Sequence, residues 1–146
     1  MRARNGAYTA LAAVAFFFAA CLLVQVFLAG MGVFDGPERF EAHRNFGYTI
    51  GMLTLVMVVI AIAGRVGRVL IGLSVLTLVQ FSLQSVFILF REDQPAIAAL
   101  HPVNGVLLLV VTLAIGGLAL AGRAAQARAR AADASTPQGA PAEAAS

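Results

Sequence analysis

Four long apolar runs constrain the fold of this chain more than any other feature of its sequence. They cover residues 7–29, 43–63, 69–90 and 101–121, and none of them contains an acidic residue or a lysine. A helix needs about 20 apolar residues to cross the hydrocarbon layer, because backbone polar groups must pair with each other in lipid. A hydrophobic fraction of 60% with only 12% charged residues agrees with this interpretation. We therefore expect an all-α protein, a transmembrane four-helix bundle in the lipid bilayer.

The distribution of arginine predicts the orientation of these spans. All ten basic residues are arginines, and cytoplasmic flanks are enriched in them. Seven of the arginines lie in segments that we expect on the cytoplasmic side. They are Arg2 and Arg4 before the first run, Arg65 and Arg68 between the second and third, and Arg123, Arg128 and Arg130 after the fourth. In the other two loops acidic residues outnumber arginines. We expect a multi-pass protein of the plasma membrane with both termini in the cytoplasm, and no nucleic-acid partner, since the basic character comes from these flanks.

The chain divides into a membrane domain, residues 1–122, and a segment of different composition, residues 123–146. The second segment is rich in Ala, Arg, Pro and Ser and ends "STPQGAPAEAAS". Such a composition offers little apolar surface to bury, which predicts a disordered cytoplasmic tail. Cys21 is the only cysteine, so we expect it to be a small buried residue without a disulfide.

An internal repeat with an offset of 58 residues relates the second and fourth runs. His43 matches His101 at this offset, and Gly47 matches Gly105. Further polar matches are Asp35 with Asp93, Pro37 with Pro95, Thr54 with Thr112 and Arg65 with Arg123. The bundle is therefore predicted to consist of two tandem helical hairpins in parallel orientation, with both histidines at the same depth near the outer face.

Two histidines at one depth on equivalent helices can act as axial ligands of a haem iron. In both repeats the residue one helical turn after the histidine is glycine, Gly47 or Gly105, which leaves room for a porphyrin edge. We therefore predict a bis-histidine site for haem b, with His43 and His101 as metal ligands. A redox or membrane protein would be the natural partner of such a module.

Two further groups of polar residues can complete this site. Outer-loop arginines can pair with the haem propionates, and amide groups can accept the second imidazole N–H. The arginines are Arg39, Arg44 and Arg91, and the amides are Gln25, Gln84 and Asn104.

A structural interpretation competes with the haem site. A histidine at the mouth of a span is commonly an interfacial anchor, and Gly47 with Gly51 forms a G-x-x-x-G packing element. On this reading the chain is a cofactor-free packing or accessory subunit, and the sequence leaves its oligomeric state open. A third reading is a solute or ion pathway, which the lack of intramembrane acids disfavours. No catalytic motif or pair of intramembrane carboxylates is present, so an enzyme is the less favoured expectation.

The segments "EAHRNFGY" and "LHPVNG" resemble actinobacterial families of small four-span membrane proteins that carry domains of unknown function. This resemblance covers roughly residues 8–122 and implies the four-helix fold. More distantly, the chain is similar to one four-helix half of haem A synthase, with a histidine at the outer end of the second and fourth spans. His43 and Arg44 match an E-x-x-H-R signature of that family, with Phe40 at its acidic position. The likeness implies haem binding rather than oxygenation chemistry.

Overall fold

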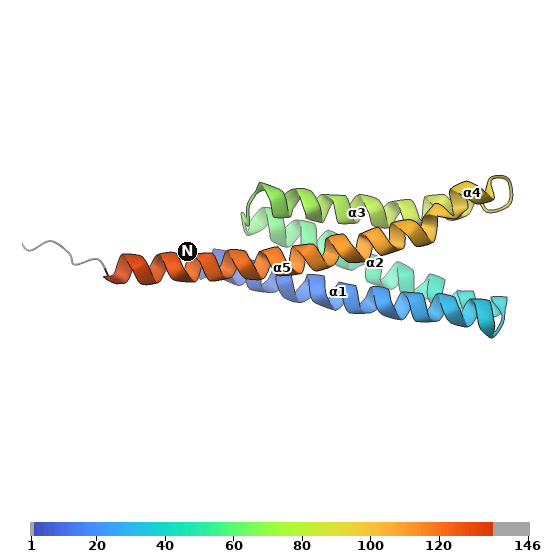
Figure 1. Cartoon of the computed structure of the whole chain (residues 1–146), viewed down its shortest axis with the longest axis horizontal. Coiled ribbons are helices and arrows are strands. Elements are labelled where there is room, and N and C mark those ends of the chain that lie inside the picture. The colour runs from blue at the N-terminus through green and yellow to red at the C-terminus, as the bar shows by residue number, and fades with distance from the viewer. Residues whose placement is uncertain (1, 136–146) are drawn as a thin grey trace, which may run out of the picture.

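The computed structural model describes residues 2–135, and these residues form a purely helical structure. Figure 1 shows four long helices side by side, with two short helical turns near one end. The elements are α1 Arg2–Phe34, η1 Pro37–Arg39, α2 Phe40–Ala63, α3 Arg68–Leu89, α4 Pro95–Ala98 and α5 Leu100–Ser135. The four long helices are each long and apolar enough to cross a membrane. The predicted all-α, transmembrane four-helix bundle is confirmed.

The four long helices form a ring in which each one packs against two neighbours. Helix α1 packs against α2 and α5, and helix α3 packs against the same two helices. The pairs α1 with α3 and α2 with α5 are therefore diagonal across the bundle, without close backbone contact within residues 2–135. At one end lie the α1–α2 connection and α4, and at the other lie the α2–α3 loop and the N-terminus (Figure 1). The second and fourth predicted spans are thus opposite each other.

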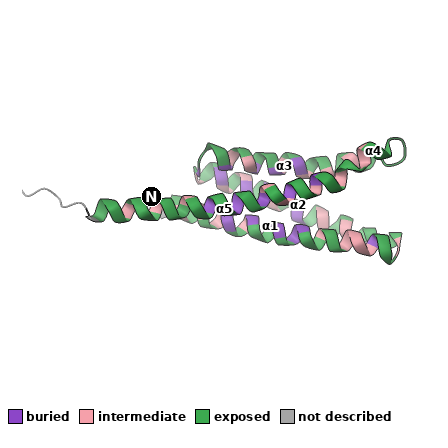
Figure 2. Cartoon of the chain, viewed as in Figure 1, coloured by how far each residue is buried: buried purple, intermediate pink, exposed green. Residues whose placement is uncertain are grey.

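The interior of the bundle has the same register in its two hairpins. The buried positions of α2 are Ile50, Thr54, Met57 and Ala61, and α5 buries Leu108, Thr112, Ile115 and Ala119, each 58 residues later. Helix α1 buries Leu11, Ala15, Phe18 and Cys21, and α3 buries Leu70, Ser74, Thr77 and Gln80, each 59 residues later. Figure 2 shows these buried positions as purple patches along the middle of the helices. As expected, Cys21 is buried and unpaired.

Tyr8 of α1 contacts both the α2–α3 loop and α5 at the end of the bundle that carries this loop. Its hydroxyl donates a hydrogen bond to the carbonyl oxygen of Val66 at 2.6 Å, which ties α1 to the loop. Its ring lies against Gly122 of α5, where an added Cβ would be 2.6 Å from the nearest ring atom. A Cβ added at Gly64 would come still closer to the Cβ of Ala7. These contacts hold α1, α5 and the α2–α3 loop together. We call the region formed by Ala7, Tyr8, Gly64, Val66 and Gly122 the inner corner.

Helix α5 extends further than the sequence led us to expect. A disordered tail was predicted from residue 123, whereas residues 123–135 continue α5 to Ser135. Ala and Arg are strong helix formers, and adding residues to an existing helix avoids the cost of nucleation. Residues 136–146, the rest of the predicted tail, lie outside the described residues.

Candidate functional site

The fold brings the two histidines of the chain together at the end opposite the inner corner. His43 lies in the first turn of α2 and His101 at the start of α5, so the pair joins two diagonal helices. Their ring centroids are 6.1 Å apart and their planes are inclined by 66°. Both side chains are half-buried. The repeat predicted that the two histidines lie at one depth, and the structure places them side by side although the backbones of α2 and α5 are not in close contact.

Each histidine is held by a main-chain carbonyl of a neighbouring helix. The Nδ1 atom of His43 is 3.0 Å from the carbonyl oxygen of Gln25 in α1, and Nδ1 of His101 is 3.0 Å from that of Gln84 in α3. A carbonyl oxygen can only accept, so Nδ1 carries the proton in both rings. In the neutral form this assigns the lone pair to Nε2. A hydrogen bond from one ring nitrogen to a carbonyl is the arrangement that orients metal-binding histidines.

The amide side chains of the same two glutamines lie against the glycines that follow the histidines. A Cβ on Gly47 would be 2.6 Å from Nε2 of Gln25, and one on Gly105 would be 3.2 Å from the end of the Gln84 amide. Each glycine therefore leaves room for an amide, a role that the sequence interpretation had assigned to a porphyrin edge.

The Gln84 amide has one orientation that pairs donors with acceptors. In it, Nε2 donates to the carbonyl of His101 at 2.9 Å and Oε1 accepts from the backbone N–H of Gly105 at 3.1 Å. The same Nε2 is then 3.2 Å from Nδ1 of His101. The shorter contact to the Gln84 carbonyl requires a proton on Nδ1, so we assign the hydrogen bond to that carbonyl.

The other residues predicted for the site are engaged elsewhere or face outward. Asn104 is buried and donates to the carbonyl oxygen of Gln80 at 2.7 Å, so it joins α5 to α3 one turn below His101. Arg39 pairs with Asp35 at 2.7 Å and Arg91 with Glu92 at 3.2 Å. Arg44 is exposed beside His43. Because the two ion pairs are exposed, they contribute little stability and leave both guanidinium groups accessible to other anions.

Phe40 and Gln80 also lie in this region, although neither was among the predicted site residues. The ring of Phe40 is edge-on to His43, with centroids 6.4 Å apart and planes inclined by 88°. Phe40 precedes His43 by three residues, a spacing that places both on one helical face. The side chain of Gln80 is 9% exposed, and its Oε1 has no hydrogen-bond partner. Oε1 of Gln25 is likewise buried and unpartnered, so two acceptor groups lie in the interior near the histidines.

The nitrogen groups that could serve as metal ligands at this end are the two imidazoles. Within residues 2–135 no group of three or more His, Cys, Asp and Glu side chains is placed to hold a bare metal ion. Two ligands from opposite sides suit a metal that brings its remaining ligands with it, as the iron of a haem does.

The fold and its composition define a small, multi-pass α-helical membrane protein. Residues 25–90 match the model of a family described as "Family of unknown function (DUF6220)". The matched segment contains Gln25, His43 and Gln84 and ends before His101. No curated protein and no solved structure matches the chain. The similarity to this family, of unknown function itself, implies no activity.

Proposed function

We propose that this protein binds one haem b between His43 and His101 and serves as a haem-carrying or electron-transfer module of the plasma membrane. The observation that carries the proposal is the histidine pair itself. The two rings come from diagonal helices. Nδ1 of each ring donates to a main-chain carbonyl, so the lone pair of each neutral ring is on Nε2 and can bind a metal. Bound haem b would supply one-electron redox chemistry at its iron.

The separation of the two rings agrees with axial ligation of one metal. Two imidazole nitrogens bound at about 2 Å to one iron are about 4 Å apart, which puts the ring centres about 6 Å apart. The observed centroid distance is 6.1 Å. Side chains chosen only for interfacial anchoring have no need of this spacing.

The surrounding residues have separate tasks in this proposal. The carbonyls of Gln25 and Gln84 fix the direction of the two imidazoles and make Nε2 a better ligand. Gly47 and Gly105 give the two glutamine amides the space that a side chain would fill. Arg39, Arg44 and Arg91 are accessible at the same end and can pair with propionates. Asn104 donates to the carbonyl oxygen of Gln80 and so joins α5 to α3 just below the site.

The proposal includes two statements about the whole chain. The first is that the hairpins arose from a duplication, which the shared offset of identities and buried positions supports. The second is that the histidines face the outside of the cell. The arginine-rich flanks of the opposite end support this orientation.

The test is an absorption spectrum of the purified protein, oxidised and then reduced with dithionite, after expression with added haem. His43→Ala and His101→Ala are compared with Asn45→Ala, which removes an exposed polar side chain two residues from His43. We expect sharp reduced bands in the wild type and in Asn45→Ala, and at least about a tenfold loss of haem in each histidine variant. Circular dichroism checks that all variants keep their helices.

A wild-type protein without haem at full supply, or haem retained in both histidine variants, would refute the proposal. The first result would favour the alternative, a cofactor-free packing or accessory subunit. One observation favours that alternative specifically: the glutamine amides already fill the space beside Gly47 and Gly105.

A further inference from the structure

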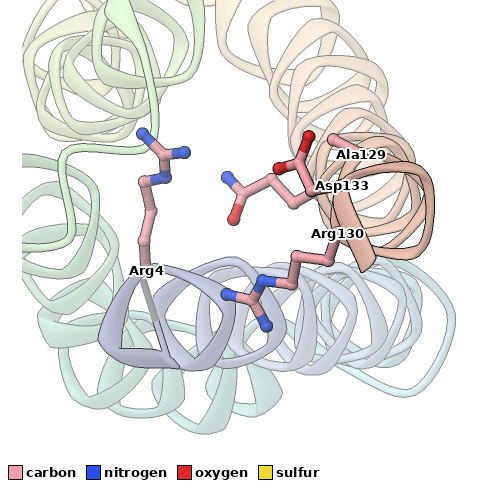
Figure 3. Close-up of a pocket in the computed structure, with 5 residues that line it drawn as sticks. Arg4, Ala129, Arg130 and Asp133 are labelled. Carbon is pink, nitrogen blue, oxygen red and sulfur yellow. The ribbon is translucent and has the colours of Figure 1, made fainter. Parts of the chain in front are cut away.

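A second polar site lies at the other end of the bundle, beyond the inner corner. A pocket of about 80 Å³ opens between α1 and α5. Its lining residues are Arg4, Gln126, Ala129, Arg130 and Asp133. Figure 3 shows Arg4 reaching in from α1, while Arg130 and Asp133 approach from α5. The pocket has room for several water molecules or for one tetrahedral phosphate group.

The depth of this pocket corresponds to the headgroup layer of a bilayer. Tyr8 and Gly122 contact each other at the inner corner, where the apolar parts of α1 and α5 end. Arg4 and Gln126 are each four residues beyond that level, about 6 Å along a helix. The polar layer on each side of the hydrocarbon core is about 5–8 Å thick. Arg4 and Gln126 therefore lie at the level of lipid phosphates.

The backbone of Arg130 lies farther along α5 than that of Gln126, but its long side chain reaches back toward the level of Arg4 and Gln126. Helical side chains tilt toward the N-terminus of their helix, so the long Arg130 side chain points back toward Gln126 and the membrane. Side chains of α1, which runs in the opposite direction, tilt away from the membrane. The tilt therefore reduces the difference in level along the bundle axis between the ends of the Arg4 and Arg130 side chains.

The electrostatics of the pocket favour an anion. The Nη2 atom of Arg130 is buried and has no hydrogen-bond partner, which is costly for a charged donor. The two ion pairs of the described residues, Asp35 with Arg39 and Glu92 with Arg91, are both at the histidine end. Asp133 is the one acidic residue that lines the pocket. With Arg4 and Arg130 it leaves the lining with a net charge of one positive unit. Four more arginines, Arg65, Arg68, Arg123 and Arg128, belong to the same end of the bundle without lining the pocket, and they make this end positively charged.

We infer that this pocket binds the phosphate group of an anionic phospholipid, with Arg4 and Arg130 as the charged donors and the Gln126 amide as a neutral one. A planar guanidinium donates two parallel hydrogen bonds to a phosphate, which suits these side chains. The position in the headgroup layer selects a lipid over a soluble phosphate. The site is independent of the histidines and does not rest on haem binding.

The experiment is native mass spectrometry of the full-length protein in detergent micelles that contain phosphatidylglycerol. The fraction of protein that retains one lipid is measured for the wild type and for Arg4→Gln with Arg130→Gln. The matched control, Arg123→Gln with Arg128→Gln, removes two exposed charges from the same end. We expect about a tenfold loss of lipid retention in the pocket variant and less than about a twofold loss in the control.

Two further arms make the result specific. Asp133→Asn should increase retention, because it removes the carboxylate that opposes the phosphate. Inorganic phosphate at millimolar concentration should not displace the lipid. Equal losses in the two double variants would mean a diffuse basic surface and would overturn the site. Displacement by inorganic phosphate would overturn the lipid as its ligand and assign the pocket to a soluble phosphate.

Discussion

Substitution of Gly64 by alanine tests how tightly the inner corner is packed. Gly64 follows α2 directly and has an ordinary helical backbone conformation, so alanine causes no backbone strain there. An added Cβ would contact Cβ of Ala7 closely and would be 2.7 Å from the carbonyl oxygen of Ile60. Neither of these atoms belongs to a flexible side chain. The helices themselves would therefore have to move apart.

The expected magnitude follows from a comparison with Gly72 in α3. Nothing lies within 4 Å of a Cβ at Gly72, so Gly72→Ala should only gain helix propensity, about 0.8–1 kcal/mol. Overpacking at a rigid contact costs about 1–3 kcal/mol, which outweighs that gain at Gly64. Because both variants share the propensity gain, they should differ by the cost of overpacking, about 1–3 kcal/mol in the free energy of unfolding. Gly47→Ala should fall between them, because the atom in its way ends the flexible Gln25 side chain.

The measurement is unfolding in mixed micelles with increasing sodium dodecyl sulfate, followed by circular dichroism. Gly117→Ala serves as a second baseline, because nothing lies within 4 Å of its added Cβ either. If Gly64→Ala were as stable as Gly72→Ala, α1 and the end of α2 would not be in the close contact described, and the argument for a fixed inner corner would fail.

Two other substitutions probe single hydrogen bonds. Tyr8→Phe removes the bond to the Val66 carbonyl and should lower the free energy of unfolding by about 1–2 kcal/mol in the same titration; an unchanged midpoint would show that this bond adds no stability. Thr112 and Thr54 occupy equivalent buried positions, but Oγ1 of Thr54 donates to the Gly51 carbonyl at 2.7 Å while Oγ1 of Thr112 has no partner. Thr112→Val should therefore be neutral or stabilising by up to about 1 kcal/mol, and Thr54→Val should cost about 0.5–1.5 kcal/mol; the reverse order would contradict the hydrogen-bond assignment.

The sequence predicted the helices and the meeting of the histidines because both depend on patterns that a linear chain displays. Apolar runs fix the spans, and an offset of 58 residues places His43 and His101 at one depth. Pro37 and Pro95, which match in the repeat, each begin a short helical segment, a position that suits proline.

What the sequence did not predict depends on main-chain atoms and on neighbouring helices. The acceptors of the imidazole N–H groups were expected among amide side chains, but they are the carbonyls of Gln25 and Gln84. Every residue has such a carbonyl, so no residue type marks it. Residues 123–135 lack an apolar face that would mark them as part of a packed helix, but the helix propensity of Ala and Arg lets α5 continue through them.

The hydrogen bonds of the two histidines also bear on the choice between anchoring and ligand binding. An interfacial anchor needs its polar atoms satisfied, and one carbonyl satisfies only Nδ1 of each ring. Each half-buried ring then retains a lone pair at Nε2, and the two ring centres are 6.1 Å apart. In the proposed haem site both lone pairs would bind the iron, whereas in an interfacial anchor they would be left to water. Because the Nδ1 bond is the same in both hairpins, it leaves two lone pairs rather than one at this site, which is the requirement of a metal bound from opposite sides.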